Sequence, residues 1–228
     1  MIKIENVDVY GFESAIRGMR NPKNSWDRSD SKYEMHVDGE WHYEIGENDL
    51  TLMKSLSKAG TDHAKYLRMI NVTMDITAPL YWWKEHDQYK VGTVTNSCST
   101  MHKIQDREFT LDDFSHEQLI NEAFPITDEY VETYLDCMVD TIKALNCARC
   151  MFVETKDKRY WWQMIQLLPS SYNQRRTVQL NYAVLKNMYF ARRNHRLDEW
   201  HTFCDMCLTL PYFKEICVDT LKDGVNNE

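Results

Sequence analysis

The sequence predicts a mixed α/β fold of the α+β class, in which one compact domain spanning residues 1–228 contains a central β-sheet flanked by long helices. Three observations lead to this fold class. Strand-like segments lie mostly in the first half of the chain, and the second half has an almost continuous helical pattern. The 228 residues are 43% hydrophobic and include 13 Tyr, 8 Phe and 7 Trp, which is enough for a packed core and argues against disorder.

The first predicted elements are a strand and a short helix. Over residues 2–9 the apolar side chains recur at roughly every second position, which predicts a strand that ends at Gly11. A short helix is predicted over residues 12–19. Residues 20–46 are polar and rich in turn-forming side chains, so we expect irregular structure or a hairpin there.

A helix, a second strand and an aromatic helix complete the first half. Asp49 is a good helix-capping residue, and it precedes a helical apolar pattern that stops at Gly60. Apolar side chains at every even position from 70 to 76 predict a strand over 69–76 with one buried face. Pro79 should open a short helix rich in aromatic side chains, because proline fits the first helical turn.

Helix signals dominate the second half. Ser171-Tyr172-Asn173-Gln174 matches the S-x-x-Q capping box, whose two side chains satisfy free backbone N–H groups at a helix start. The helix that it opens would run for about 21 residues, or roughly 30 Å. Helices are predicted over five stretches: from Pro125–Thr127 through Leu145, over 159–168 before Pro169, from 171 to 192, over 197–208, and from Pro211 through Leu221.

Composition excludes the common phosphate-binding loops. Glycine makes up only 7 of the 228 residues, and neither G-x-G-x-x-G nor G-x-x-x-x-G-K-[ST] is present, so a Rossmann turn and a P-loop are excluded. With 27 Lys+Arg against 35 Asp+Glu, the net charge of −8 argues against a nucleic-acid partner. Any bound phosphate would therefore be held by side chains and helix ends.

Hydropathy and cysteine usage indicate a cytoplasmic protein without a membrane partner. No apolar run approaches the roughly 18–20 residues of a membrane span. Charged residues interrupt the N-terminal segment, which is unlike a signal peptide. Seven cysteines is an odd number, and we expect free thiols in a reducing compartment.

Two C-x-x-C pairs, Cys147–Cys150 and Cys204–Cys207, are the candidate metal ligands. Four thiolates could hold a tetrahedral zinc ion. However, 53 residues separate the pairs, and both lie in helical patterns without a turn-forming glycine. We therefore favour buried free cysteines and predict no metal site, and the eight histidines form no H-E-x-x-H motif.

One apolar stripe of the predicted helix over 171–192 contains two polar residues. The stripe follows the spacing of a single helix face and consists of Val178, Asn181, Leu185, Met188 and Arg192. A buried Arg is rare unless it is paired, so Arg192 requires either an internal carboxylate or a ligand anion.

Arg175 and Arg176 would lie in the first turn of the same predicted helix. Positive charge there opposes the helix dipole, unless an anion binds at the helix N-terminus. The alternative is that both arginines are simply solvated.

Residues 89–103 form the second informative stretch. This segment contains many hydroxyl side chains, an amide and a single glycine. Such small donors and acceptors suit a loop around a polar ligand. An ordinary strand and turn rich in threonine is the alternative.

Together these stretches resemble the flavin-dependent thymidylate synthase family over roughly residues 50–210. The family signature R-H-R-x-x-S-x-N-E-x-S-x-R-Y is preceded by Glu-His and followed much later by Leu-Pro, then by an Asn and an Arg on a long helix. Asp62-His63 stands where the Glu-His would be. Leu168-Pro169 precedes Asn181 at the family interval, and Leu185 and Arg192 also match.

The central signature departs from the family at several positions. Gln88-Tyr89-Lys90 stands in place of Arg-His-Arg, Thr93 in place of the first Ser, and Asn96 and Cys98 in place of Glu and the second Ser. If the alignment with the signature is shifted by one residue, Asn96 matches the signature Asn and Ser99 matches the second Ser. A one-residue insertion in the segment reconciles the two alignments.

The remaining departures concern arginines. The closing Arg-Tyr of the signature is absent, and Ala183 replaces an Arg two residues after the helix Asn. The C-terminal Arg of the family corresponds to either Arg192 or Arg193.

The resemblance implies an enzyme that methylates C5 of a uridine nucleotide, converting dUMP into dTMP with methylenetetrahydrofolate, NADPH and reduced FAD. It also implies a homotetramer and no enzyme nucleophile, so that positioning and charge stabilisation carry the reaction. The residues implied for FAD are His63, Lys90, Thr93 and Asn96. Those implied for the nucleotide are Asn181, Arg192 and Ser99, with Arg192 and Ser99 catalytic, and we add Arg175 and Arg176 as replacements for a lost phosphate contact.

Two other functions stay open at this point. A divergent relative could keep the pyrimidine-nucleotide pocket with altered or lost flavin chemistry, because Gln-Tyr-Lys carries less positive charge than Arg-His-Arg. A non-enzymatic helical interaction protein is the third possibility.

Overall fold

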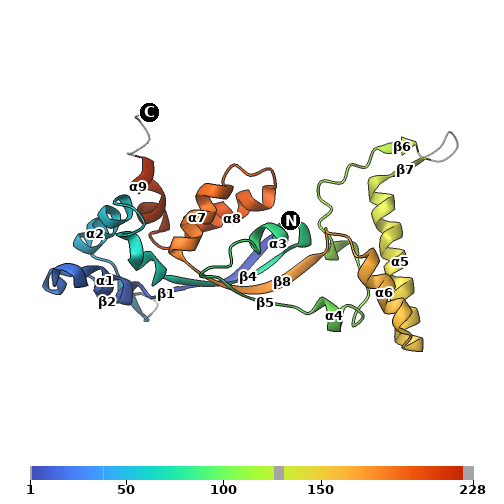
Figure 1. Cartoon of the computed structure of the whole chain (residues 1–228), viewed down its shortest axis with the longest axis horizontal. Coiled ribbons are helices and arrows are strands. Elements are labelled where there is room, and N and C mark those ends of the chain that lie inside the picture. Colours follow the sequence, from blue (N-terminus) through green and yellow to red (C-terminus); the bar gives the residue numbers. More distant parts are fainter. Residues whose placement is uncertain (1, 38, 126–130, 223–228) are drawn as a thin grey trace. The chain divides into compact units, whose positions relative to one another are not determined.

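The computed structural model describes residues 2–37, 39–125 and 131–222, and it has the predicted mixed α/β fold (Figure 1). Four strands form the main sheet in the order β1-β4-β8-β5. These strands are β1 (Lys3–Tyr10), β4 (Asn71–Pro79), β8 (Asn173–Asn181) and β5 (Val94–Ser97). Two antiparallel hairpins pair β2 (Lys32–Met35) with β3 (Trp41–Glu44), and β6 (Ala123–Pro125) with β7 (Val131–Thr133).

The helices are α1 (Phe12–Arg20), α2 (Glu47–Lys58), α3 (Leu80–His86), α4 (Thr100–Lys103), α5 (Tyr134–Thr155), α6 (Lys158–Leu167), α7 (Tyr182–Arg192), α8 (Asp198–Thr209) and α9 (Asp219–Lys222). Short 3-10 helices cover Asn21–Lys23, Trp26–Arg28, Ala64–Arg68 and Leu111–Asp113, and a π-helical turn covers Lys214–Val218.

The chain divides into two compact units. The first unit contains residues 1–3, 76–88 and 96–176, and the second unit contains residues 4–75, 89–95 and 177–228. A single domain over the whole chain therefore stays a prediction, and each unit is described by itself below.

Helices α5 and α6 lie side by side in the first unit, where they form its core with the segment around Phe114 (Figure 1). Buried members of this core are Ile104, Phe109, Phe114, Leu145, Ala148 and Met164. Ring contacts of Tyr172 with Phe109 and Phe114 connect the turn before β8 to the core segment around Phe114.

The sequence patterns of β4 and α3 are confirmed. Side chains along β4 alternate between part-buried and buried, and Val72, Met74 and Ile76 are at most 1% exposed. The aromatic helix begins directly after Pro79, and Trp82 and Trp83 are both fully buried. The alternation of apolar side chains was therefore sufficient to predict β4, and the position of Pro79 was sufficient to predict the start of α3.

The predicted helix over 171–192 is wrong in its first half. Residues 173–181 form strand β8, in which Arg175 is exposed and Val178 is buried, and helix α7 begins only at Tyr182. The side chain of Asn181 caps α7, because its Oδ1 accepts a hydrogen bond of 3.1 Å from the Val184 N–H. Pairing within the sheet overrides the local capping signal at Ser171, so neither Arg175 nor Arg176 lies at a helix start.

Two other helix starts also differ from the prediction. Pro125 ends β6, and α5 starts at Tyr134 behind a capping box formed by Thr133 and Asp136; residues 126–127 of the predicted start lie outside the described residues. The last predicted helix begins as a π-helical turn at Lys214 rather than as an α-helix at Pro211.

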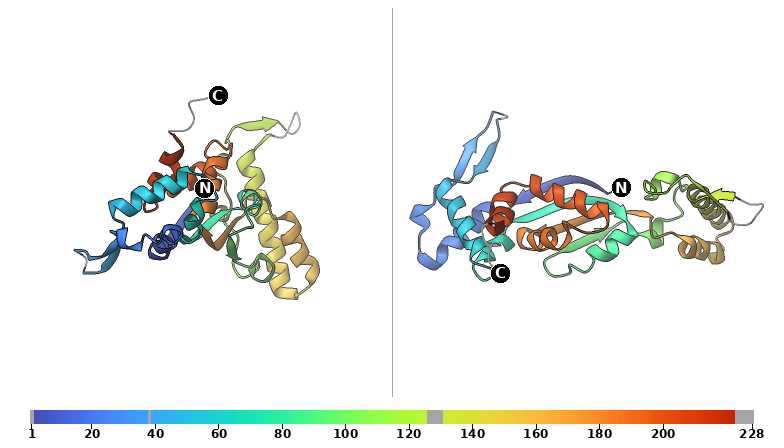
Figure 2. Two further views of the ribbon diagram at one scale, coloured as in Figure 1. Left: turned by 60° about the vertical axis from the view of Figure 1, so that its left-hand side comes forward. Right: turned by 90° about the horizontal axis from the view of Figure 1, so that it is seen from above.

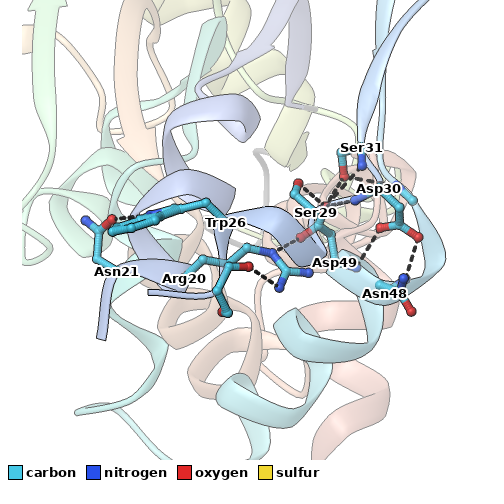
Figure 3. A network of polar contacts seen from close by, with 10 residues as sticks. Arg20, Asn21, Trp26, Ser29, Asp30, Ser31, Asn48 and Asp49 are labelled. Atoms are coloured by element: carbon cyan, nitrogen blue, oxygen red, sulfur yellow. Dashed lines mark hydrogen bonds and ion pairs between the residues drawn. The ribbon is translucent and has the colours of Figure 1, made fainter. Parts of the chain in front are cut away.

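Asp49 has a structural role in the second unit that differs from the predicted helix cap. Its carboxylate is fully buried and accepts hydrogen bonds from Arg20 Nε at 2.6 Å, Ser29 Oγ at 2.7 Å and Ser31 Oγ at 2.6 Å (Figure 3). Burial alone would raise the pKa of Asp49, but the hydrogen bonds from Ser31, Ser29 and Arg20 outweigh it and lower the pKa. This network attaches the loop before the β2–β3 hairpin to α1 and α2.

Asp30 supplies the cap that the sequence assigned to Asp49. Its carboxylate accepts hydrogen bonds from the backbone N–H groups of Asn48 and Asp49 at 2.9 and 3.1 Å. Asp30, which precedes the β2–β3 hairpin, thus satisfies free backbone N–H groups in the first turn of α2.

His86 is a buried neutral histidine in the first unit. It is 1% exposed, neither ring nitrogen has a hydrogen-bond partner among the described residues, and the ring contacts Trp82 and Trp83. Burial lowers its pKa to about 4, with Asp87 opposing the shift and Arg176 adding to it. The folded first unit therefore disfavours the protonated imidazole.

Removing the charge of Asp49 should destabilise the protein strongly. Asp49→Asn leaves the buried Arg20 guanidinium without its counter-charge, so we expect the free energy of unfolding to fall by about 3–5 kcal/mol in urea titrations. Glu47→Gln, an exposed acid in the same helical turn, is the control and should cost less than about 1 kcal/mol. Similar losses for the two variants would contradict this role of the network.

The burial of His86 should make stability depend on pH. The unfolded chain binds a proton at His86 near pH 6.5, whereas the folded chain does so only near pH 4. The contribution of the neutral His86 to the free energy of unfolding is therefore complete above pH 6.5 and is lost as the pH falls toward 4. We expect His86→Phe to abolish about 2 kcal/mol of the stability difference between pH 7 and pH 5, measured by urea unfolding. His201→Phe, which alters a half-exposed histidine, should leave that difference unchanged.

Candidate functional site

The segment that follows α3 contacts helix α7 in the second unit. Arg192 Nε, at the end of α7, donates a hydrogen bond of 2.9 Å to the Tyr89 hydroxyl. The same guanidinium lies 5.5 Å from the centre of the Tyr89 ring and 5.0 Å from that of the buried Trp200. Arg192 is thus part-buried between two aromatic rings, as favourable cation–π geometry requires.

Gly92 permits a close approach between this segment and the start of α7. Its backbone has φ +77°, and an added Cβ would lie 3.0 Å from Asn181 Nδ2 and 3.1 Å from Val184 Cγ2. The Asn181 side chain therefore faces both its own helix, through Oδ1, and the backbone at Gly92, through Nδ2. Only glycine satisfies both the backbone conformation and the contact distance without strain.

Three residues implied for a cofactor lie in the second unit. The Thr93 hydroxyl is buried and has no hydrogen-bond partner among the described residues, and an unsatisfied buried hydroxyl is costly unless a ligand pairs with it. Lys90 is exposed. His63 is also exposed, and its backbone N–H bonds to Gly60 O at 3.1 Å just before the 3-10 helix Ala64–Arg68.

A cavity of about 250 Å³ lies between the end of α2, the 3-10 helix Ala64–Arg68 and α7, and its lining includes Thr61 and Ala64 on either side of His63 in the sequence but not His63. Its lining combines the basic side chains of Lys58, Arg68 and Lys186 with apolar residues that include Ala183. Lys186 Nζ donates to Ser57 Oγ at 2.8 Å, and burial lowers the pKa of this lysine. Cations on an apolar wall suit a ligand with a flat apolar body and an anionic group.

The first unit contains Asn96 and Ser99, on the continuation of the same segment. Residues 94–97 form strand β5, in agreement with the alternative of a threonine-rich strand, and a loop around a polar ligand stays a prediction. Asn96 is exposed, and the Ser99 hydroxyl accepts a hydrogen bond of 3.2 Å from the His102 N–H as the cap of α4.

Arg175 and Arg176 have different surroundings in the first unit. The Arg175 side chain is exposed, and its backbone carbonyl accepts from the Cys98 N–H at 3.0 Å. Arg176 is held by Gln174 Oε1 at 2.9 Å and Asp87 Oδ1 at 2.8 Å, and its guanidinium stacks 4.2 Å from the Trp83 ring. The interpretation of Arg176 as solvated is therefore wrong.

The predicted site residues are divided between the two units. His63, Lys90, Thr93, Asn181 and Arg192 belong to the second unit, and Asn96, Ser99, Arg175 and Arg176 to the first. Sequence reasoning missed the hydroxyl of Tyr89, the ring of Trp200 and the cavity with Lys186. The signal for Lys186 was its place one helical turn after Ala183.

Arg192 and Arg193 have different surroundings at the end of α7. The Arg193 guanidinium is exposed and lies 5.1 Å from the Phe190 ring on its own helix. Arg192, in contrast, contacts Tyr89 of the signature-like segment.

The C-x-x-C pairs differ from each other. Cys204 and Cys207 are buried as expected, whereas Cys147 and Cys150 on α5 are exposed, so the expectation of burial is wrong for them. Burial raises the pKa of Cys204 to about 11, so this thiol is protonated at neutral pH. Within residues 2–37, 39–125 and 131–222, no group of three or more His, Cys, Asp or Glu side chains could hold a metal ion. No helix in this part of the chain is long and apolar enough to cross a bilayer.

Comparison with known proteins identifies the fold. No protein-family model and no curated protein matches the sequence. Thymidylate synthase X (ThyX) from Helicobacter pylori, crystallised with FAD and dUMP, aligns with a TM-score of 0.66 and 16% identity over 97% of this chain and 100% of that chain.

A second similar structure is the UMP/dUMP methylase PolB from Streptomyces cacaoi, bound with 5-Br dUMP. It aligns with a TM-score of 0.61 and 15% identity over 98% of this chain and 95% of that chain. The chain therefore has a ThyX-like fold, as the motif resemblance implies.

Gly92→Ala should weaken the contact between residues 89–93 and α7. A methyl group at this left-handed position faces both backbone strain and two close side-chain atoms, so we expect a loss of about 2–3 kcal/mol in unfolding free energy. Gly60→Ala is the matched control, because Gly60 has φ +100° with nothing within 4 Å, and it should show the backbone cost of about 1 kcal/mol alone. Equal losses would show that the contact with Asn181 is unimportant.

Proposed function

We propose that this protein is a flavin-dependent methyltransferase that converts dUMP into dTMP, with FAD, NADPH and methylenetetrahydrofolate. The observation that carries the proposal is the contact between Tyr89 of the signature-like segment and Arg192 of α7. Two stretches that resemble one enzyme family separately in sequence thus meet in space. The similarity of fold to proteins solved with FAD and dUMP supports the same reaction.

The residues of the second unit fit FAD on two observations. The buried Thr93 hydroxyl lacks a partner that a polar ring edge could supply. The cavity at the end of α2 presents Lys58, Arg68 and Lys186, which suit a pyrophosphate in a chain that has no glycine-rich loop. In this proposal His63, Lys90, Thr93 and Asn96 contact FAD, which supplies hydride transfer when it is bound.

The nucleotide would be held by charge and by amide donors. The bond to Tyr89 orients the Arg192 guanidinium, and a guanidinium is the side chain that suits an anionic nucleotide. Asn181, Ser99 and the exposed Arg175 would add polar contacts, with Arg192 and Ser99 nearest the reacting base. Arg176 is engaged by Asp87 and Gln174, and its role as a phosphate contact stays a prediction, as does that of Arg175.

Catalysis by this site needs no enzyme nucleophile. The contribution of the chain would be to hold the uracil ring, the flavin and the folate in reacting geometry, and to stabilise negative charge that develops on the uracil. The proposal also includes a cytoplasmic homotetramer, as in the family that the sequence resembles.

A second function is favoured by one particular observation. Tyr89 stands where the family has a histidine, and its hydroxyl engages Arg192. Fewer cations then remain for a flavin pyrophosphate, so a relative that binds a pyrimidine nucleotide without flavin chemistry is the alternative.

Two measurements on the purified protein separate these functions. We expect a yellow protein that releases FAD on denaturation, and a melting temperature that rises with dUMP, because a ligand that binds only the folded state stabilises it. A colourless protein that is not reconstituted by FAD but is stabilised by dUMP or UMP would favour the alternative. The absence of both signals would reject both enzyme functions.

Variants of the adjacent arginines test which one binds the nucleotide. Arg192→Gln should weaken dUMP binding at least about tenfold in calorimetry, because a hydrogen bond to a charged group contributes about 1.5–3 kcal/mol. Arg193→Gln is the matched control, since it removes the same charge from an exposed neighbour, and it should change the affinity less than about twofold. Equal effects would reject the specific role of Arg192.

A further inference from the structure

A second, larger cavity lies in the second unit, away from the residues implied for flavin and nucleotide. Its volume is about 790 Å³, and it is bounded by the β2–β3 hairpin, the start of α1 and the segment from Pro211 to Glu215. The β2–β3 hairpin projects from the neighbouring helices (Figure 2). Its residues Tyr33, His42, Tyr43 and Glu44 line the cavity. This volume is within the range of small-molecule sites.

Aromatic rings form much of the cavity wall. Tyr33 and Tyr43 face each other across the hairpin, with ring centres 5.0 Å apart in an edge-to-face arrangement. On the opposite side, Phe12 packs edge-on against Tyr212 at 5.8 Å. Tyr10 adds a ring that is 45% exposed. The negative faces of such rings attract cations.

Carboxylates accompany the rings. Glu13 accepts a hydrogen bond of 3.1 Å from the Tyr33 hydroxyl, and Glu44 accepts one of 3.5 Å from the Tyr212 hydroxyl. These bonds hold the hairpin against α1 and against the segment after Pro211. A third acid, Glu215, also lines the cavity.

The charge of the lining is strongly one-sided. No Lys or Arg is among the described residues that line the cavity, and its one basic side chain is His42. His36 lies next to the lining and contacts Glu44 at 2.8 Å, which compensates that carboxylate only when the histidine is protonated. The hydrogen bond to Glu13 raises the pKa of Tyr33, so the ring stays neutral at physiological pH and the cavity keeps its negative potential through its glutamates.

We propose that this cavity binds a small organic cation, whose ammonium group lies against the tyrosine rings and is neutralised by Glu13 and Glu215. Rings alone would accept any apolar molecule, and carboxylates alone would accept any cation. The combination selects a quaternary or protonated organic amine, and the volume leaves room for an organic body attached to it. The binding site is independent of the proposed methyltransferase reaction.

Calorimetric titration with three probes tests the charge requirement. The probes are choline, spermidine and the uncharged alcohol in which a carbon atom replaces the nitrogen of choline. We expect choline to bind at least about tenfold more tightly than the alcohol, because the two have the same shape and differ in the cation–π and charge interactions. The relative affinity of spermidine shows whether quaternary or protonated amines are preferred.

Variants locate the site. Tyr33→Leu keeps apolar bulk but removes the ring, and the double variant Glu13→Gln with Glu215→Gln keeps shape but removes two charges; each should weaken the preferred cation at least about tenfold. Glu154→Gln, an exposed acid at the end of α5 in the first unit, should leave the affinity unchanged. Circular dichroism and melting temperature show whether each variant is folded.

Three results would overturn the proposal. They are no saturable binding of either cation at millimolar concentration, equal affinity for choline and its uncharged analogue, and unchanged affinity in folded variants of the cavity.

Discussion

The close approach of Gly92 to Asn181 is the contact on which the candidate site depends. Asn181 caps α7 with one atom of its amide and faces Gly92 with the other, so the helix start and the incoming segment share one side chain. Because Gly92 has no Cβ, the segment can pass this helix closely enough for Tyr89 to reach Arg192.

Positive charge is arranged differently here from the family signature that the sequence resembles. Gln88 and Tyr89 stand in place of Arg and His, and Ala183 in place of a further Arg. The structure has Lys186 at the cavity that Ala183 lines, and Tyr89 orients Arg192 through its hydroxyl. Two of the cations in the second unit have defined partners, because Lys186 bonds to Ser57 and Arg192 bonds to Tyr89.

Secondary-structure elements were predicted correctly from the sequence where the local pattern agrees with the tertiary environment. The even positions of β4 and the proline before α3 predicted both elements, because burial and backbone geometry act there on neighbouring residues. The helix prediction for residues 171–181 was wrong, because a local capping signal competes there with pairing in a sheet whose partner strands are distant in the sequence. The helix-face spacing that singled out Asn181 and Arg192 does not hold, because Asn181 ends β8 and α7 begins at Tyr182. The stacking of Arg176 on Trp83 and the contact of Arg192 with Tyr89 join residues that are far apart in the sequence, so they left no local signal.

The most direct test of the proposed reaction follows the hydrogen atom that methylation must remove from C5 of uracil. The protein would be incubated with dUMP tritiated at C5, FAD, NADPH and methylenetetrahydrofolate, and tritium released into water would be counted. We expect release that requires both the flavin and the folate, with dTMP formed in equal amount. Binding of dUMP without any release of tritium under these conditions would contradict the proposed reaction.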